Sequence, residues 1–118
     1  MEPLPKKIVI YTREDGSQPF TDWVLGIKDV RKREAIDNRL IRVMMENYGD
    51  HKRLAGGLIE LRFIKLGWRI YFAEVGRVIV LMLCAGDKNT RGGQTRDIAQ
   101  AMEYWEDFRR GSSNAKHE

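Results

Sequence analysis

The chain has little of several residue types that mark specialised protein classes. It contains one cysteine, Cys84, so no internal disulfide can form, which fits a reducing cytoplasm better than a disulfide-stapled secreted fold. It has two histidines, His51 and His117. The carboxylates near His51 have no second histidine or cysteine beside them. We therefore expect neither a metal site nor a cofactor.

Long apolar segments are also lacking. The longest apolar run, Val78–Ala85, is too short to cross a bilayer. The opening residues Met1–Lys7 lack the apolar core of a signal peptide, and no glycine-rich nucleotide-binding motif is present. The sequence thus predicts a cytoplasmic protein without a membrane partner.

The composition is that of a globular domain with a basic surface. Of 118 residues, 42% are hydrophobic and 32% are charged, which suits one domain over residues 1–118 with loose ends at 1–5 and 111–118. The formal net charge is +4, and the isoelectric point is about 9.4. A positive surface favours anionic partners such as nucleic acid, although charge alone also fits an ordinary solvated surface.

Periodicity predicts an α+β domain. A short strand at 8–11 is followed by a helix with Pro19 in its first turn, capped by Asp15 or Ser17, and by a helix over 30–48 capped by Asp29. Strands are expected at 58–64, 68–74 and 77–84, and a last helix at 94–110. The order β-α-α-β-β-β-α predicts two layers, with helices packed on a mostly antiparallel four-stranded sheet.

Alternation along the meander predicts where its charged side chains lie. Pairing Phe63 with Trp68 keeps the apolar residues on one face and sets Arg62 directly opposite Arg69. Like charges opposed on neighbouring strands are unfavourable unless an anion lies between them. The pair therefore predicts a phosphate site on an open sheet face. The alternative is an exposed ion pair with Glu60, worth at most about 1 kcal/mol.

Other residues could extend this predicted phosphate site to a nucleic-acid-binding surface. Tyr71 is a candidate for stacking on a base, although a strand tyrosine also serves in packing. Further cations flank the strands and could contact phosphate: Lys52, Arg53, Lys88 and Arg91.

Three motifs together resemble the RelE/ParE toxin superfamily, in its HigB-like branch of phage-derived addiction-module killer proteins. They are Glu60-Leu61-Arg62, Gly67–Phe72 and Leu81–Lys88, and the likeness extends over nearly the whole chain. The resemblance implies the same β-α-α-β-β-β-α order. It also implies the toxin of a type II toxin–antitoxin system, a ribosome-dependent endoribonuclease that cleaves mRNA and inhibits translation.

The resemblance further implies partners and site residues. The partners would be the ribosome with its mRNA and a cognate antitoxin, a helix-turn-helix protein of the HigA type, through which operator DNA is contacted indirectly. Arg62, Arg69 and Lys88 stand where the family has basic catalytic or phosphate-binding residues. Glu60 stands where some members have a basic residue, and Tyr104 is a poor match for their C-terminal tyrosine.

These residues are consistent with metal-independent cleavage by attack of the RNA 2′-hydroxyl on the adjacent phosphate. Arg62 and Arg69 would stabilise the phosphorane, since guanidinium groups stay charged and bind phosphate bidentately. Glu60 would be the base, and Lys88 the acid or a further cation. Because a carboxylate beside arginines has a lowered pKa, this position argues against Glu60 as a base.

Two other functions share the fold. A ParE-like toxin would inhibit DNA gyrase and would need no phosphate site. A non-catalytic RNA-binding relic of a toxin would retain the fold and the basic surface. The basic cluster favours RNA cleavage over the first of these alternatives.

Overall fold

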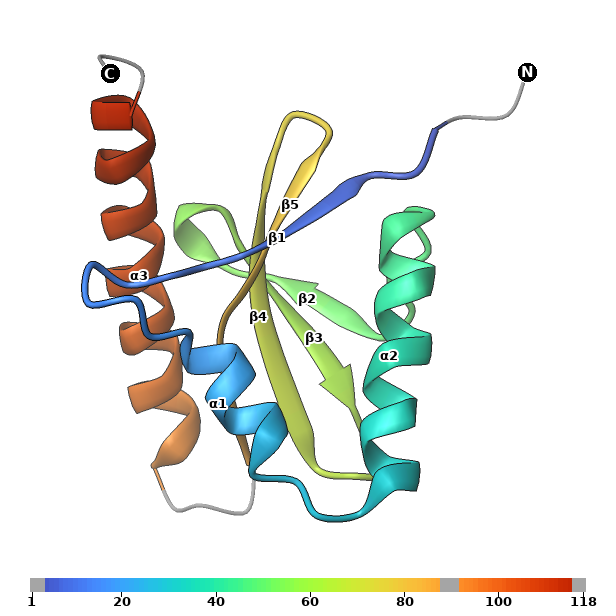
Figure 1. Cartoon of the computed structure of the whole chain (residues 1–118). Helices are drawn as coiled ribbons and strands as arrows, with labels where there is room; N and C mark the ends of the chain where they lie inside the picture. The colour runs from blue at the N-terminus through green and yellow to red at the C-terminus, as the bar shows by residue number, and fades with distance from the viewer. Residues whose placement is uncertain (1–3, 88–91, 116–118) are drawn as a thin grey trace.

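The computed structural model describes residues 4–87 and 92–115 and confirms the predicted α+β class. Figure 1 shows the helices arranged around a central sheet. The elements are β1 (Lys7–Ile10), α1 (Pro19–Leu25), α2 (Val30–Met44), β2 (His51–Arg53), a 3₁₀ turn (Ala55–Gly57), β3 (Leu58–Phe63), β4 (Trp68–Val75), β5 (Val78–Asp87) and α3 (Gly93–Ala115).

The sheet has five strands in the order β1-β5-β4-β3-β2, one more than predicted. β1 runs parallel to β5, and the other neighbours are antiparallel. The additional strand is β2, whose residues His51–Arg53 were predicted to lie in a loop. All three of its side chains are exposed, so this edge strand lacks the apolar alternation that would reveal it in the sequence.

The helices cover both faces of the sheet, which corrects the predicted two layers to three. α1 and α2 pack on one face and α3 on the other (Figure 1). The meander strands are apolar on both sides over part of their length, because Leu58 and Ala73 face α3 while Ile59 and Phe72 face α2. A second apolar surface of this kind requires its own covering helix.

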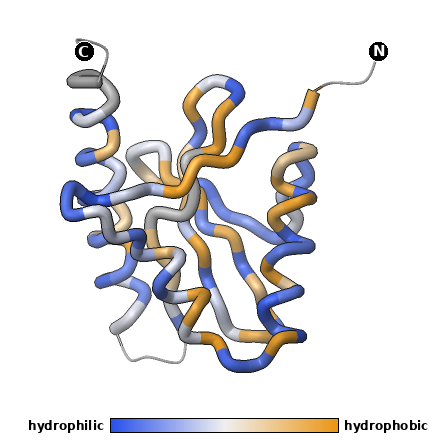
Figure 2. The backbone as a smooth tube through the Cα atoms, viewed as in Figure 1, coloured by the Kyte–Doolittle hydropathy of each residue, from blue (hydrophilic) through white to orange (hydrophobic). Residues whose placement is uncertain are grey.

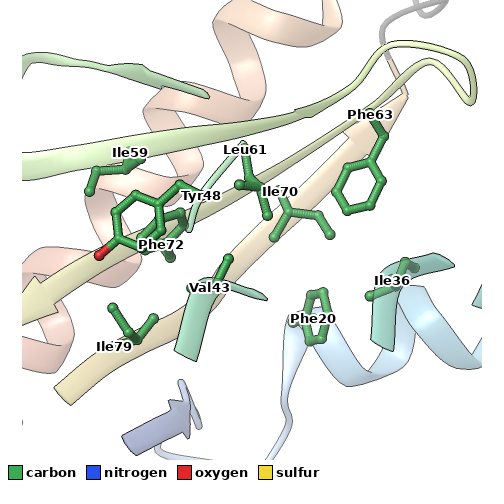
Figure 3. Packing of buried hydrophobic residues seen from close by; sticks show 10 residues of the cluster. All are labelled: Phe20, Ile36, Val43, Tyr48, Ile59, Leu61, Phe63, Ile70, Phe72 and Ile79. Atoms are coloured by element: carbon green, nitrogen blue, oxygen red, sulfur yellow. The ribbon is translucent and has the colours of Figure 1, made fainter. Parts of the chain in front are cut away.

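The larger core lies between the sheet and the first two helices. Figure 3 shows Phe20 of α1 and Ile36 and Val43 of α2 lying opposite strand side chains. Tyr48, just beyond α2, completes this side of the core. The strand residues of the cluster are Ile59, Leu61, Phe63, Ile70, Phe72 and Ile79.

The smaller core holds α3 against the other face. Ala101 and Trp105 pack on Tyr71 and Cys84, and the Trp105 indole donates a 3.0 Å hydrogen bond to the carbonyl of Gly56. Figure 2 shows apolar segments along the strands and more polar segments along much of α3. α3 is therefore fixed along its middle by apolar packing.

Several element ends differ from the predicted ones. Gln18, and not Asp15 or Ser17, precedes α1, whereas the predicted Asp29 cap accepts a hydrogen bond from the Arg31 amide. α2 ends at Met44 because Glu46 adopts a left-handed φ of 63°, which stops the helix before Tyr48. α3 continues to Ala115, past the predicted stop at Gly111.

Burial predicts where the fold is sensitive to truncation. Ile70 is 0% exposed, and Ile70→Ala should lower the free energy of unfolding by about 2–5 kcal/mol by leaving a cavity. Ile64, in the turn between β3 and β4, is 68% exposed, so Ile64→Ala should change stability by no more than about 0.5 kcal/mol. Urea titration followed by tryptophan fluorescence measures both, and equal losses would contradict the described packing.

Candidate functional site

The two predicted arginines lie directly opposite each other on neighbouring strands. Phe63 pairs with Trp68, and Arg62 pairs with Arg69, which confirms the register read from the sequence. Both arginines line a pocket of about 240 Å³ between the β3–β4 turn and the start of α3. The remaining lining residues are Asp50, Phe63, Ile64, Trp68 and Gln94.

The pair was predicted to lie on an open sheet face, and this prediction is wrong because a helix covers much of that face. α3 packs on this face and leaves accessible the end where the arginines lie. Glu60 and Tyr71 are both 0% exposed, while the Arg62 side chain remains 37% exposed. The predicted stacking of Tyr71 on an RNA base is therefore wrong for this conformation, because the ring is covered.

Glu60 is a buried carboxylate with three donors from three elements. It accepts hydrogen bonds from Arg62 Nε at 2.9 Å, from the Tyr71 hydroxyl at 3.1 Å and from Gln94 Nε2 at 3.0 Å. Burial alone would raise the pKa of Glu60, but the hydrogen bonds from Arg62, Gln94 and Tyr71 bring this pKa below its ordinary value. A carboxylate held in this way is a weak base and a firm support for Arg62.

Arg69 has an incompletely satisfied guanidinium group. Its Nη1 atom is buried and has no hydrogen-bond partner in the described part of the chain. A buried donor without a partner is costly, and such atoms are rare in folded proteins. Arg69 therefore has an unused donor at the pocket, whereas the Nε atom of Arg62 is already paired with Glu60.

Asp97, near the start of α3, lies against the strand next to Arg69. Its position depends on Gly86 of β5, which lies opposite Arg69 of β4. A Cβ at position 86 would overlap the Oδ2 atom of Asp97. Burial raises the pKa of Asp97, and the charges of Arg69 and Arg96 only partly oppose this shift. Sequence reasoning missed this position of Asp97, because a contact between α3 and β5 has no local signal in the sequence.

The other predicted cations are placed differently from one another. Lys52 lies opposite Glu60 on the exposed edge strand, so it shares the face of the arginine pair. Arg53 lies opposite Ile59, hence on the other face, where it pairs with Glu74 at 3.1 Å. Lys88 and Arg91 lie outside the described residues.

Two residues considered as alternatives have other roles. Burial raises the pKa of the Cys84 thiol to about 12, with a further contribution from Asp97, and its Sγ lies 3.4 Å from the Asp97 carbonyl oxygen. Such a thiol is inert as a nucleophile at neutral pH. Tyr104 stacks on Tyr11 with ring centroids 4.9 Å apart, away from the arginine pocket in a separate cavity.

Two further features are absent from the described residues. None of their histidine, cysteine and carboxylate groups gathers into a set that could hold a metal ion. None of the described helices is both long and apolar enough to cross a membrane.

The chain resembles a protein of Haemophilus influenzae. The two are 37% identical over 83 residues, which are 70% of this chain and 81% of the other protein. The chain therefore belongs to the same family as this protein. The description of that family member, "uncharacterized protein", assigns no activity, and no family model and no solved structure matches the chain. The activity must consequently be inferred from the site.

The contact between Gly86 and Asp97 predicts a specific steric coupling. Gly86→Ala should force the Asp97 carboxylate off the strand and lower the free energy of unfolding by about 1–3 kcal/mol. Adding Asp97→Ala should restore most of the loss. Gly111→Ala, where a Cβ would meet no other atom, is the control and should be neutral or stabilising. A double-mutant cycle by urea unfolding tests this prediction, and strictly additive effects would contradict the coupling.

The raised pKa of Asp97 predicts how stability changes with pH. Because folding disfavours the charged form, Asp97 costs stability at pH values above its folded pKa and costs nothing below its unfolded pKa. Asp97→Asn should therefore raise the melting temperature at neutral pH, with the gain disappearing in acid. Asp37→Asn on the exposed side of α2 should show no such pattern. Thermal melts across the acid range would contradict this cause if the gain persisted below the unfolded pKa.

Proposed function

We propose that the chain is a RelE-like toxin of a type II toxin–antitoxin system, acting as a metal-independent endoribonuclease on mRNA at the ribosome. The observation that supports this most is the apposition of Arg62 and Arg69, with a buried Arg69 donor left without a described partner. The three sequence motifs and the basic isoelectric point agree with the proposal, and so does the order of the elements apart from the additional edge strand β2.

The arginine pair has the chemistry of an oxyanion site. Two opposed guanidinium groups repel each other, and Glu60 offsets the charge of Arg62 but makes no hydrogen bond to Arg69. A phosphate in the pocket would satisfy the unused Arg69 donor and relieve the repulsion. The same donors would stabilise the additional negative charge that develops on the phosphoryl oxygens in the transition state.

The residues around the pair take distinct parts in this proposal. Arg62 and Arg69 bind the scissile phosphate, and Lys52 contacts the neighbouring backbone. Glu60 holds Arg62 in place instead of accepting a proton, because its hydrogen bonds lower its pKa. Lys88 and Arg91 remain predicted as an acid and a phosphate contact from outside the described residues.

The proposal also names partners. The substrate would be mRNA bound to a translating ribosome, and a cognate helix-turn-helix antitoxin would neutralise the protein and connect it to operator DNA. Synthesis of such a toxin alone should stop colony growth, and co-expression of its cognate antitoxin should restore growth.

One observation favours a second candidate, a non-catalytic RNA-binding relic. The ion pair between Glu60 and Arg62 at 2.9 Å offsets one of the two cations at the pocket, which lowers its charge without removing its RNA-binding chemistry. RNA binding without cleavage is the result that this candidate predicts.

Cleavage of message by purified protein in a translating-ribosome extract tests the proposed function. Arg69→Ala and Arg62→Ala should each lower the cleavage rate about 10²–10³-fold, as loss of a transition-state donor does. Arg31→Ala removes an exposed arginine of α2 at the same cost in net charge and should leave the rate unchanged.

Three results would contradict the proposed function in different ways. Wild-type rates in both pocket variants would remove the arginine pair from the reaction. Binding of RNA without any cleavage by the wild-type protein would favour the relic. DNA double-strand breaks after induction, with message left intact, would favour a ParE-like action on gyrase.

A further inference from the structure

Two carboxylates lie close to the arginine pair, Glu60 beside Arg62 and Asp97 beside Arg69, and they are held in opposite ways. Glu60 accepts three hydrogen bonds and is fully buried. No described residue donates a hydrogen bond to the Asp97 carboxylate, and Asp97 is only partly buried. A proton acceptor needs a free lone pair that substrate can reach, so Asp97 is better suited to this role than Glu60.

We propose that Asp97 is the catalytic residue that takes the proton from the attacking 2′-hydroxyl group of RNA. This inference rests on the proposed nuclease function and names a group that neither the strand pattern nor the family resemblance assigned. It replaces Glu60, the base predicted from the sequence.

The fold fixes Asp97 beside the phosphate-binding arginines. Gly86 lies directly across from Arg69, and the Asp97 carboxylate occupies the space that a side chain at position 86 would fill. The Asp97 carbonyl lies within 3.4 Å of Cys84 Sγ, which helps to hold the start of α3 on β5. The contact of the Asp97 backbone with Cys84 thus holds the carboxylate on one side, and the absence of a side chain at Gly86 leaves space for it on the other.

The other nearby carboxylates are less suited. Asp87 lies opposite Trp68 and hence on the other side of the strand from Gly86. Asp50 lines the pocket but is exposed, and its backbone carbonyl accepts hydrogen bonds from the Arg39 side chain and the Arg62 amide. Asp50 is therefore the competing candidate that an experiment must separate from Asp97.

The charges around Asp97 support its use as a base. Burial raises its pKa, and the nearest cations, Arg69 of β4 and Arg96 of α3, lower it by less. Tyr71 and Cys84, which also face it, have pKa values raised by burial and stay neutral near pH 7. A carboxylate with a raised pKa is a stronger base than an ordinary aspartate.

The proposed step balances without a metal. The 2′-oxygen attacks phosphorus, the O2′–P bond forms as the P–O5′ bond breaks, and Asp97 accepts the 2′ proton. Water from the solvent supplies the proton that the departing O5′ takes up, and the hydroxide left behind takes the 2′ proton from Asp97, which restores the carboxylate. The products are a 2′,3′-cyclic phosphate and a 5′-hydroxyl end, while Arg62 and Arg69 hold the non-bridging oxygens.

The test is single-turnover cleavage of ribosome-bound mRNA by the full chain, followed across the acidic and neutral pH range. The wild-type rate should rise with pH as Asp97 loses its proton and then level off. Asp97→Asn should cleave at least about 10²-fold more slowly and lose the rise, while binding the ribosome–mRNA complex as tightly as wild type. Asp97→Glu should recover part of the rate and a rise with pH.

Controls separate this proposal from the proposed function. Glu106→Gln, on an exposed side of α3, should retain the wild-type rate and profile. Melting temperatures check that each variant is folded. The isosteric Asp97→Asn variant is expected to fold like the wild-type protein.

The outcomes are distinguishable. If Asp97→Asn keeps the wild-type profile while Arg69→Ala is inactive, or if Asp50→Asn is the change that removes the rise, Asp97 is not the base although the nuclease function holds. If the wild-type protein cleaves no message, the nuclease function fails and the assignment of Asp97 fails with it.

Discussion

The buried carboxylate of Glu60 is the constraint on which the rest of the site depends. A charge withdrawn from water is tolerated only when hydrogen bonds replace its hydration, and here the donors come from β3, β4 and α3. The donors are Arg62, Tyr71 and Gln94. The Glu60 side chain therefore orients an arginine and binds both a strand tyrosine and the first turn of α3. The arginine pocket exists because these three elements converge on a single anion.

In the proposed reaction the site separates two tasks that one carboxylate could not perform together. A carboxylate that orients an arginine must be saturated with donors, which lowers its pKa and makes it a poor proton acceptor. A carboxylate that accepts a proton must stay accessible and without strong partners. Glu60 meets the first requirement and Asp97 the second. Their different pKa directions follow from their different hydrogen bonding, although burial acts in the same sense on both.

Much of this arrangement could be predicted from the sequence, because strand alternation is a strong constraint. The pairing of Phe63 with Trp68 and the opposition of Arg62 and Arg69 follow from keeping apolar residues on one face. The sequence was less informative wherever two patterns overlapped. Leu58, Tyr71 and Ala73 form a second apolar face, and the pattern did not show that α3 would cover it.

The remaining features depend on contacts between distant segments, which local patterns do not carry. β2 is a short exposed edge strand recognisable only from its pairing with β3. The approach of Asp97 to Gly86 requires the bulge in β5 and the position of α3, neither of which has a local signal. Gln94 likewise becomes part of the site only because α3 begins beside Glu60.

The parallel pairing of β1 with β5 has a consequence for how the protein is made. Lys7 through Ile10 are synthesised well before their partners Val78 through Leu81, which follow only after two helices and three other strands. Until β5 has emerged from the ribosomal tunnel, β1 has no neighbour and the sheet remains unfinished at that edge. Folding of the native sheet must therefore wait until late in translation, with a high contact order and slow closure as the expected kinetic signature.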